Sequence, residues 1–202
     1  MKAFWILKGS PMTGYSVLAF DRFIGDMRAL FAATPPEQAL WEGVRDLVKV
    51  LCADEAMRAA SRHWEAKKGR EYILHEDEEH GFFVGALVRE PHHRAGVHDH
   101  GSTWTIYGVL DGDERTHIYD RLDDGSVSGQ ARLKLTRHYD APAGHVDMVP
   151  PYVVHCEWGM GERSVAITVR DSNPNSHDQT RFDPETGRTW TSQGLNLVPL
   201  PV

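Results

Sequence analysis

"AGVHDHGSTWTIYGVLDG", residues 95–112, places two histidines one residue apart, just before a run that is typical of a β-strand. Alternate side chains of a strand lie on the same face, so His98 and His100 are expected to point the same way, with Asp99 opposite. Two imidazoles that converge on one face make half of a metal site. A lone His-x-His pair is also typical of two surface histidines near a turn, so the rest of the chain must decide between these interpretations.

The composition is that of an ordinary globular protein. The chain has 202 residues, of which 41% are hydrophobic and 25% are charged, and this suits one domain with a real core. The formal net charge is −7 and no run of Lys or Arg stands out, which argues against a nucleic-acid partner. The two cysteines, Cys52 and Cys156, lie in segments of different character and favour a reducing compartment over a disulfide framework.

No apolar window is long enough for a membrane span, and the apolar run in "MKAFWILKGSPM" at the N-terminus is too short for a secretory signal. We therefore expect a cytoplasmic protein without a membrane partner. The sequence does not fix the oligomeric state and leaves a homodimer open.

Residues 1–70 are predicted to form a helical segment that packs on the rest of the domain. Apolar residues recur at helical spacing in "FIGDMRALF" and in "TPPEQALWEGVRDLVKVL". The second stretch has a marked start, with Thr34 as N-cap, Pro35 at the first helical position and Glu37 completing a capping box. A third helix is expected over about 54–67.

Residues 71–172 are predicted to be mainly β, because short β-rich runs are separated there by Gly, Asp, Asn and Pro. Several short strands at close spacing are typical of a sandwich or barrel. Residues 173–202 are polar and rich in turn residues, and we interpret them as a coil-rich tail that packs over the barrel or stays loose. The strand predictions are YILH, GFFVGALVR, TWTIYGVL, ERTHIYD, ARLKLTRHY, HVDMV, YVVHCEW and SVAITVR.

A second stretch, "GHVDMVPPYVVH" at residues 144–155, adds a third histidine, His155, at a fixed spacing from Gly144 and Pro150. Together the two stretches resemble the two motifs of the cupin superfamily over about a third of the chain. The resemblance implies a cupin-type double-stranded β-helix, or jelly-roll barrel, behind an N-terminal helical segment. It also implies a metal held by His98, His100 and His155.

Two departures from the cupin motifs affect this site. The glutamate of the first motif would fall at Trp104 or Thr105, and the position of Gly112 favours Thr105. Neither residue is a metal ligand of this kind, which leaves three neutral imidazoles and adds no negative charge to the metal. The glycine of the second motif is replaced by Tyr152, so the turn there is expected to differ.

Among cupins, three histidines behind a helical segment look like the thiol dioxygenases, which include cysteine dioxygenase and mercaptopropionate dioxygenase. The resemblance implies a mononuclear Fe(II) cofactor, with a small anionic substrate and dioxygen as partners and a sulfinic acid as product. Imidazole also suits Zn and Ni, and Mn is a further alternative. Ala166, Thr168 and Arg170 stand where the Ser-x-His-x-Tyr of these enzymes is expected, and the carboxylate-binding Arg is absent near Leu74. These departures favour a substrate other than cysteine.

Three further residues are candidates for the pocket, each with a structural alternative. Tyr107 follows Thr105 on the same face and offers a phenol to a substrate, or is a core tyrosine whose hydroxyl is bonded elsewhere. His117 is a pocket base, or a structural strand histidine. Arg170 holds a carboxylate bidentately, or reaches solvent at the strand end.

The leading functional hypothesis is an Fe(II) cupin dioxygenase that oxidises a small thiol-containing carboxylic acid to its sulfinate. The first alternative is a non-oxidative metal-dependent lyase or isomerase, in which the metal is a Lewis acid and Tyr107 or His117 is the base. The second is a cupin that binds metal without turnover.

Overall fold

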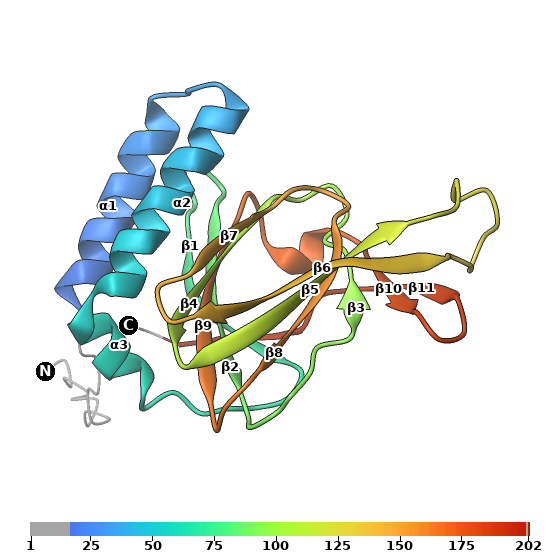
Figure 1. Cartoon of the computed structure of the whole chain (residues 1–202). Coiled ribbons are helices and arrows are strands. Elements are labelled where there is room, and N and C mark those ends of the chain that lie inside the picture. Colours follow the sequence, from blue (N-terminus) through green and yellow to red (C-terminus); the bar gives the residue numbers. More distant parts are fainter. Residues whose placement is uncertain (1–16, 201) are drawn as a thin grey trace, which may run out of the picture.

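Two six-stranded β-sheets face each other in the computed structural model, and helices cover the outer face of one of them (Figure 1). The structure describes residues 17–200 and residue 202, so the N-terminal stretch discussed above as a secretory signal lies outside the described residues. Within the described part of the chain, no helix combines the length and the apolar character that crossing a bilayer requires.

The helices are α1 (Leu18–Ala32), α2 (Glu37–Ala53), α3 (Glu55–Ser61) and the short 3-10 helix η1 (Pro174–Ser176). The strands are β1 (Arg70–Glu76), β2 (Phe83–Arg89), β3 (Val97–His98), β4 (Thr105–Asp111), β5 (Asp113–Arg121), β6 (Leu133–Pro142), β7 (Val146–Val149), β8 (Val154–Gly159), β9 (Ser164–Arg170), β10 (Gln179–Asp183), β11 (Arg188–Ser192) and β12 (Asn196–Pro199).

The strand order is that of a jelly roll. The first sheet has the order β12-β1-β2-β9-β4-β7, and the second sheet has the order β11-β10-β3-β8-β5-β6. The chain passes repeatedly from one sheet to the other, and the central strands pair antiparallel. The prediction of a mainly β, cupin-type barrel behind an N-terminal helical segment is therefore confirmed.

The main hydrophobic core lies outside the barrel, between the helices and the outer face of the first sheet. Val44, Val48 and Leu51 of α2 belong to the apolar stripe that the sequence pattern indicates, and all three are buried. At Gly108 the sheet and helix approach so closely that a Cβ would lie 2.6 Å from Val48 Cγ1 and 2.8 Å from Cys52 Sγ. The inner face of the barrel carries many more polar and charged side chains.

The start of α2 differs from the prediction. The helix begins at Glu37 after Pro36, and Thr34 has a left-handed backbone with φ of 45°, so the capping box with Thr34 and Pro35 is wrong. The reason is the second proline, because a residue that precedes proline is disfavoured in the α region. Glu37 instead accepts a hydrogen bond of 3.1 Å from Trp104 Nε1, at the edge of the first sheet.

The third helix ends earlier than predicted, at Ser61 instead of near Lys67. Arg163 explains this end, because its Nη2 donates to the backbone oxygens of Ser61 and Trp64, each at 2.8 Å. The guanidinium thus takes up carbonyl groups that a longer helix would have bonded internally.

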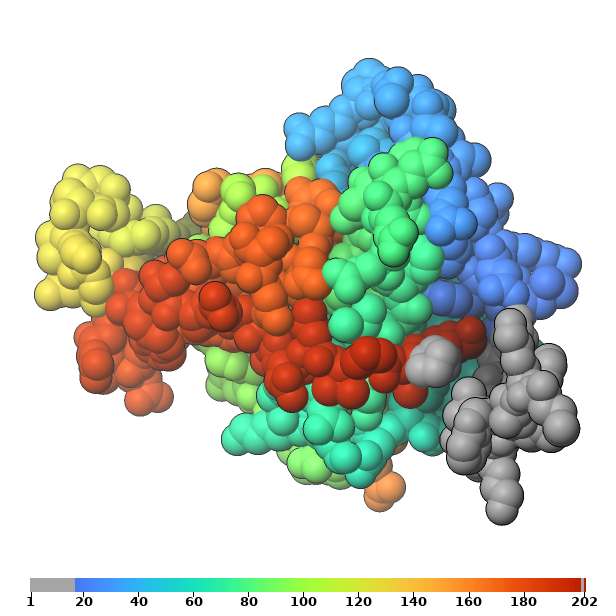
Figure 2. Space-filling model, turned by 180° about the vertical axis from the view of Figure 1, so that it is seen from behind, coloured from blue at the N-terminus to red at the C-terminus, as the bar shows by residue number. Residues whose placement is uncertain are grey.

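The C-terminal segment is not the coil-rich tail that its composition indicates. It contains β10, β11 and β12, which extend both sheets: β10 pairs with β3, and β12 runs parallel to β1. Figure 2 shows this segment as a red band across the surface. The prediction failed because these strands lie at or next to the sheet edges and carry mostly polar, half-exposed residues, so they lack an apolar alternation.

Gly112, the glycine that follows the His-x-His strand, closes the tight turn between β4 and β5. Its φ is 77°, and a Cβ there would overlap the backbone oxygen of Arg163. We predict that Gly112→Ala lowers the free energy of unfolding by at least about 2 kcal/mol. The alanine would suffer both the strain of a left-handed backbone and a steric clash of its Cβ with Arg163 O, and the two costs add. Gly161→Ala is the control, since a Cβ there meets nothing within 4 Å. Urea unfolding of both variants measures the difference, and equal stability of the two would contradict this account of the turn.

Candidate metal centre

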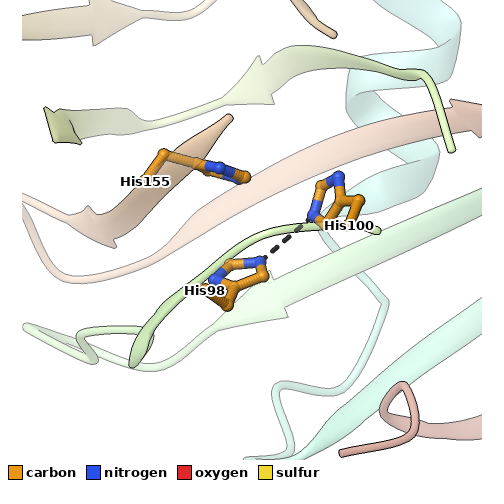
Figure 3. Close-up of side chains that lie close together, drawn as sticks. All are labelled: His98, His100 and His155. Atoms are coloured by element: carbon orange, nitrogen blue, oxygen red, sulfur yellow. Dashed lines mark hydrogen bonds between the residues drawn. The ribbon is translucent and has the colours of Figure 1, made fainter. Parts of the chain in front are cut away.

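Three imidazoles from distant parts of the sequence converge inside the barrel (Figure 3). His98 on β3 lies directly opposite His155 on the antiparallel strand β8, and His100 follows β3. The Nε2 atoms of His98 and His100 are 3.1 Å apart, and the ligand atoms of all three residues lie within 4.8 Å of one another. All three side chains are buried, so the structure brings together the set that the two motifs predicted.

Asp99 fixes the segment that carries the first two histidines. Its side chain faces away from them, as predicted, and its Oδ1 accepts hydrogen bonds from the backbone N of Gly101 at 3.0 Å and of Thr180 at 2.9 Å. The backbone N of Asp99 also donates to Thr180 O at 3.0 Å. One short acidic side chain therefore closes the turn after β3 and ties it to β10.

The turn before His155 has a left-handed residue at the position of the motif glycine. Tyr152 has φ of 61°, a backbone conformation that glycine adopts without strain and other residues rarely adopt. The Tyr152 side chain is 67% exposed, and its backbone N donates to Gly101 O at 2.9 Å. The turns that precede His155 and follow His100 are thus bonded to each other.

The second nitrogen of each ring sets its orientation. His98 Nδ1 donates to Gly96 O at 2.9 Å, and His155 Nδ1 donates to Val153 O at 2.8 Å. A carbonyl oxygen can only accept, so in the neutral ring the Nε2 lone pair faces the centre. His100 Nδ1 lies 2.6 Å from the hydroxyl oxygen of Thr105, so the residue that replaces the motif glutamate orients a histidine instead.

The electrostatics of the cluster favour neutral rings at His98 and His100 and treat His155 differently. Burial lowers the pKa of His98 to about 3 and that of His100 well below its usual value of 6.5. Burial also acts to lower the pKa of His155, but the Glu157 carboxylate outweighs it and raises that pKa. Although His155 Nε2 is 3.0 Å from Glu157 Oε1, the two atoms are not aligned for a hydrogen bond, and this buried nitrogen has no hydrogen-bond partner among the described residues. Converging imidazole lone pairs with an unpartnered buried nitrogen fit a divalent transition metal.

A cavity of about 310 Å³ opens beside His98 and His100. Seven Lys or Arg residues line it against three Glu residues, although the chain as a whole carries a net charge of −7. A second cavity, of about 320 Å³, is lined by His155 and Glu157. The first cavity therefore suits a small anion that approaches the histidine cluster.

Arg170 points into the first cavity, so the alternative that it reaches solvent is wrong. Its Nη1 donates to Glu71 Oε1 at 2.6 Å and to Thr168 Oγ1 at 3.1 Å. A buried carboxylate thus already balances its charge, which the sequence prediction did not foresee. Its buried Nε has no partner within the described chain and remains available to a ligand.

Tyr107 faces inward with Thr105, as predicted, but its hydroxyl is already engaged. It donates to Glu114 Oε2 at 2.6 Å. Burial, together with the nearby Glu114 carboxylate, raises the pKa of Tyr107 well above its usual value of 10, although the Arg89 charge acts in the opposite direction. The geometry therefore matches the alternative of a core tyrosine whose hydroxyl is bonded elsewhere.

His117 does not reach the pocket, and its prediction as a pocket base is corrected. In the register of β5 and β8, Ile118 lies opposite His155 and His117 lies opposite Cys156. Because side chains alternate along a strand, His117 and Cys156 share the outer face of the second sheet, where the His117 ring packs 4.5 Å from that of Trp158.

Two residues of the site escaped the sequence prediction. Glu157 is buried beside His155, and the two-residue spacing that singled out His98 and His100 also relates it to His155. Arg181 on β10 lies opposite His98 and lines the first cavity. No sequence signal pointed to Arg181, because it lies in the segment that was interpreted as coil.

Neither a scan against protein-family models nor a search of curated proteins finds a match to this chain. Among solved structures, it is similar to an oxalate oxidase in complex with the substrate analogue glycolate, at 21% identity and a TM-score of 0.38 over 46% of this chain and 44% of that one. A structure from a study of the DMSP lyases RdDddP and RnDddQII matches at 12% identity and a TM-score of 0.38, over 50% of this chain and 44% of that one. The Schizosaccharomyces pombe Cnp3 cupin domain matches at 10% identity and a TM-score of 0.42, over 55% of this chain and 66% of that one. This chain therefore spans less than half the length of the oxalate oxidase.

We predict that replacing His98, His100 or His155 by Ala lowers the affinity for one divalent metal at least about 10- to 100-fold, because each supplies one of the converging ligands. Metal content after loading with Zn(II) and gel filtration measures the effect. His117→Ala is the matched control, since it removes a histidine from the outer face of the same barrel. Full occupancy in all three ligand variants, with native circular dichroism, would place the metal elsewhere.

Proposed function

We propose that the chain is a mononuclear non-haem Fe(II) dioxygenase of the thiol dioxygenase type, which oxidises a small thiol-containing carboxylic acid to its sulfinate. The observation that carries the proposal is the set of three buried, converging imidazoles beside a small cationic cavity. Bound Fe(II) would supply the redox chemistry that joins both atoms of dioxygen to the substrate sulfur. His98, His100 and His155 would hold the ion, and because imidazoles add no charge they favour an anionic sulfur ligand beside it.

Arg181 is the residue best suited to hold the substrate carboxylate. It is partly buried, lines the same cavity as His98, and forms no ion pair with any carboxylate among the described residues. Its Nε donates to Ser192 Oγ at 3.1 Å and its Nη2 to Gln179 Oε1 at 3.4 Å, and its Nη1 has no partner among the described residues. Arg170 is a secondary contact, because Glu71 already balances its charge.

The non-oxidative lyase or isomerase receives less support. It requires a base in the pocket, and the two residues considered for that role are unsuited to it: His117 lies on the outer face, and the Tyr107 phenol is held protonated against Glu114. A cupin that only binds metal makes no use of the cationic cavity beside the histidines.

Reconstitution with different metals tests the reaction class. We predict that the Fe(II) protein consumes oxygen with one or more small mercapto acids and adds two oxygen atoms to the substrate, as measured with an oxygen electrode and mass spectrometry. Protein loaded with Zn(II), Ni(II) or Mn(II) is expected to be inactive in the same assay. Turnover by the zinc form under anaerobic conditions would instead assign the non-oxidative reaction.

We predict that Arg181→Gln raises the KM for the best thiol acid about 10- to 100-fold, because a charged hydrogen bond to the carboxylate is lost. For the corresponding thiol amide, which lacks the carboxylate, the same substitution should raise the KM much less. Arg94→Gln is the control, since Arg94 also lines this cavity but stacks on Trp158, 4.8 Å from the ring centroid. An equal rise in KM for the acid and the amide would show that Arg181 does not bind the substrate carboxylate.

A further inference from the structure

We infer that dioxygen reaches the histidine cluster through the second cavity, by a route separate from that of the anionic substrate. The inference rests on the dioxygenase of the proposed function. The first cavity is lined by His98 and His100, and the second, of about 320 Å³, by His155. Tyr107 and Glu157 line both, so the two cavities are neighbours and the cluster is approached from each of them.

Aliphatic side chains of the second cavity lie next to the groups that form the cluster. Ile118 on β5 is directly opposite His155 on β8, and Val149 on β7 is directly opposite Thr105 on β4. Side chains of directly opposite residues lie on the same face of a sheet, so Ile118 and Val149 both project into the barrel. Thr105 in turn lies 2.6 Å from His100 Nδ1, through its hydroxyl oxygen. The second cavity therefore has apolar walls where it meets the histidines.

The polar side chains of the second cavity are largely engaged with one another or with neighbours. Asp147 Oδ1 lies 3.0 Å from His145 Nε2, and the guanidinium of Arg137 lies over the Tyr139 ring, 5.5 Å from its centroid. Burial, together with the Asp147 carboxylate, raises the pKa of Tyr139 above its usual value of 10, so its phenol stays neutral. Arg137 and Pro150 are exposed, so the cavity they line reaches the surface.

Charge separates the two routes. Seven Lys or Arg residues line the first cavity against three Glu residues, whereas the second is lined by one guanidinium, that of Arg137, and two carboxylates, those of Asp147 and Glu157. A thiol acid that carries a negative charge is attracted to the first cavity and finds no excess of positive charge in the second. Dioxygen is uncharged and apolar, so it is not steered by the cationic residues and favours the aliphatic walls.

Separate routes matter because both reactants must be present together. A substrate bound in the first cavity, with its carboxylate on Arg181, obstructs that approach to His98 and His100. The second cavity stays open on the side of His155, so dioxygen still enters after the thiol acid has bound. We therefore expect that narrowing one cavity affects one reactant and not the other.

The kinetic test compares Ile118→Phe, which narrows the second cavity, with Leu87→Phe, a matched control that narrows the first. In the Fe(II) protein, we expect Ile118→Phe to raise the KM for oxygen at least about 5-fold, because the phenyl ring must move aside for the gas to pass. Its KM for the thiol acid should stay near that of the wild type. Leu87→Phe should raise the KM for the thiol acid and leave that for oxygen unchanged. An unchanged KM for oxygen in a folded, active Ile118→Phe protein would overturn the inference.

Xenon provides a test that requires neither turnover nor a variant, because it is uncharged and apolar and enters apolar cavities of proteins. In a crystal of the wild-type protein under xenon pressure, we expect anomalous density in the second cavity, beside Ile118 and Val149. Xenon in the first cavity alone, or in neither, would overturn the separate route even where the Ile118 variant does not fold. An Fe(II) wild-type protein that binds xenon in the second cavity but consumes no oxygen with any thiol acid would instead overturn the proposed function.

Discussion

Buried charge is the constraint around which this fold is organised. The inner face of the barrel carries Arg89, Arg170, Glu71, Glu114 and Glu157, all buried. Transferring such groups from water is costly unless each is paired, and the observed ion pairs largely compensate that cost without adding much net stability. The barrel interior is therefore a poor hydrophobic core, and the stabilising apolar contacts must come from elsewhere.

The N-terminal helices provide those contacts. Trp41, Val44 and Val48 of α2 bury against the outer face of the first sheet, where Ile106 and Ile167 project. Gly108 lets the helix come close enough to exclude water from this layer. Because the core lies on the outside of the first sheet, the inside is free to hold polar side chains, and this division of roles allows a barrel of this size to contain a reactive centre.

The sequence predicted the parts of the fold that follow from periodicity. Apolar repeats located α1 and α2, and alternation along β4 put Thr105 and Tyr107 on the inner face. The exact ends of two helices were missed. Pro36 displaces the start of α2, and a contact with Arg163, which is distant in sequence, ends α3 early. The three C-terminal strands were missed because backbone pairing at a sheet edge requires no apolar pattern.

The site was predictable to the same extent. The three histidines stand out by residue type and spacing, and the rule that joined His98 to His100 also reaches Glu157 when applied to His155. His117 was misplaced because both faces of β5 carry polar residues, so alternation alone does not reveal which face is inside. Glu71 forms an ion pair with Arg170 but not with Arg181, and a partner that is distant in sequence is visible only in the folded chain.

The central claim is that one divalent ion binds inside the barrel at His98, His100 and His155. A crystal of the metal-loaded protein, measured at the absorption edge of that metal, tests it most directly. The account predicts a single strong anomalous peak about 2.0–2.1 Å from all three Nε2 atoms, the bond length expected for imidazole ligands of zinc. A saturated protein whose anomalous peaks lie only at surface side chains, with these three imidazoles uncoordinated, would contradict it.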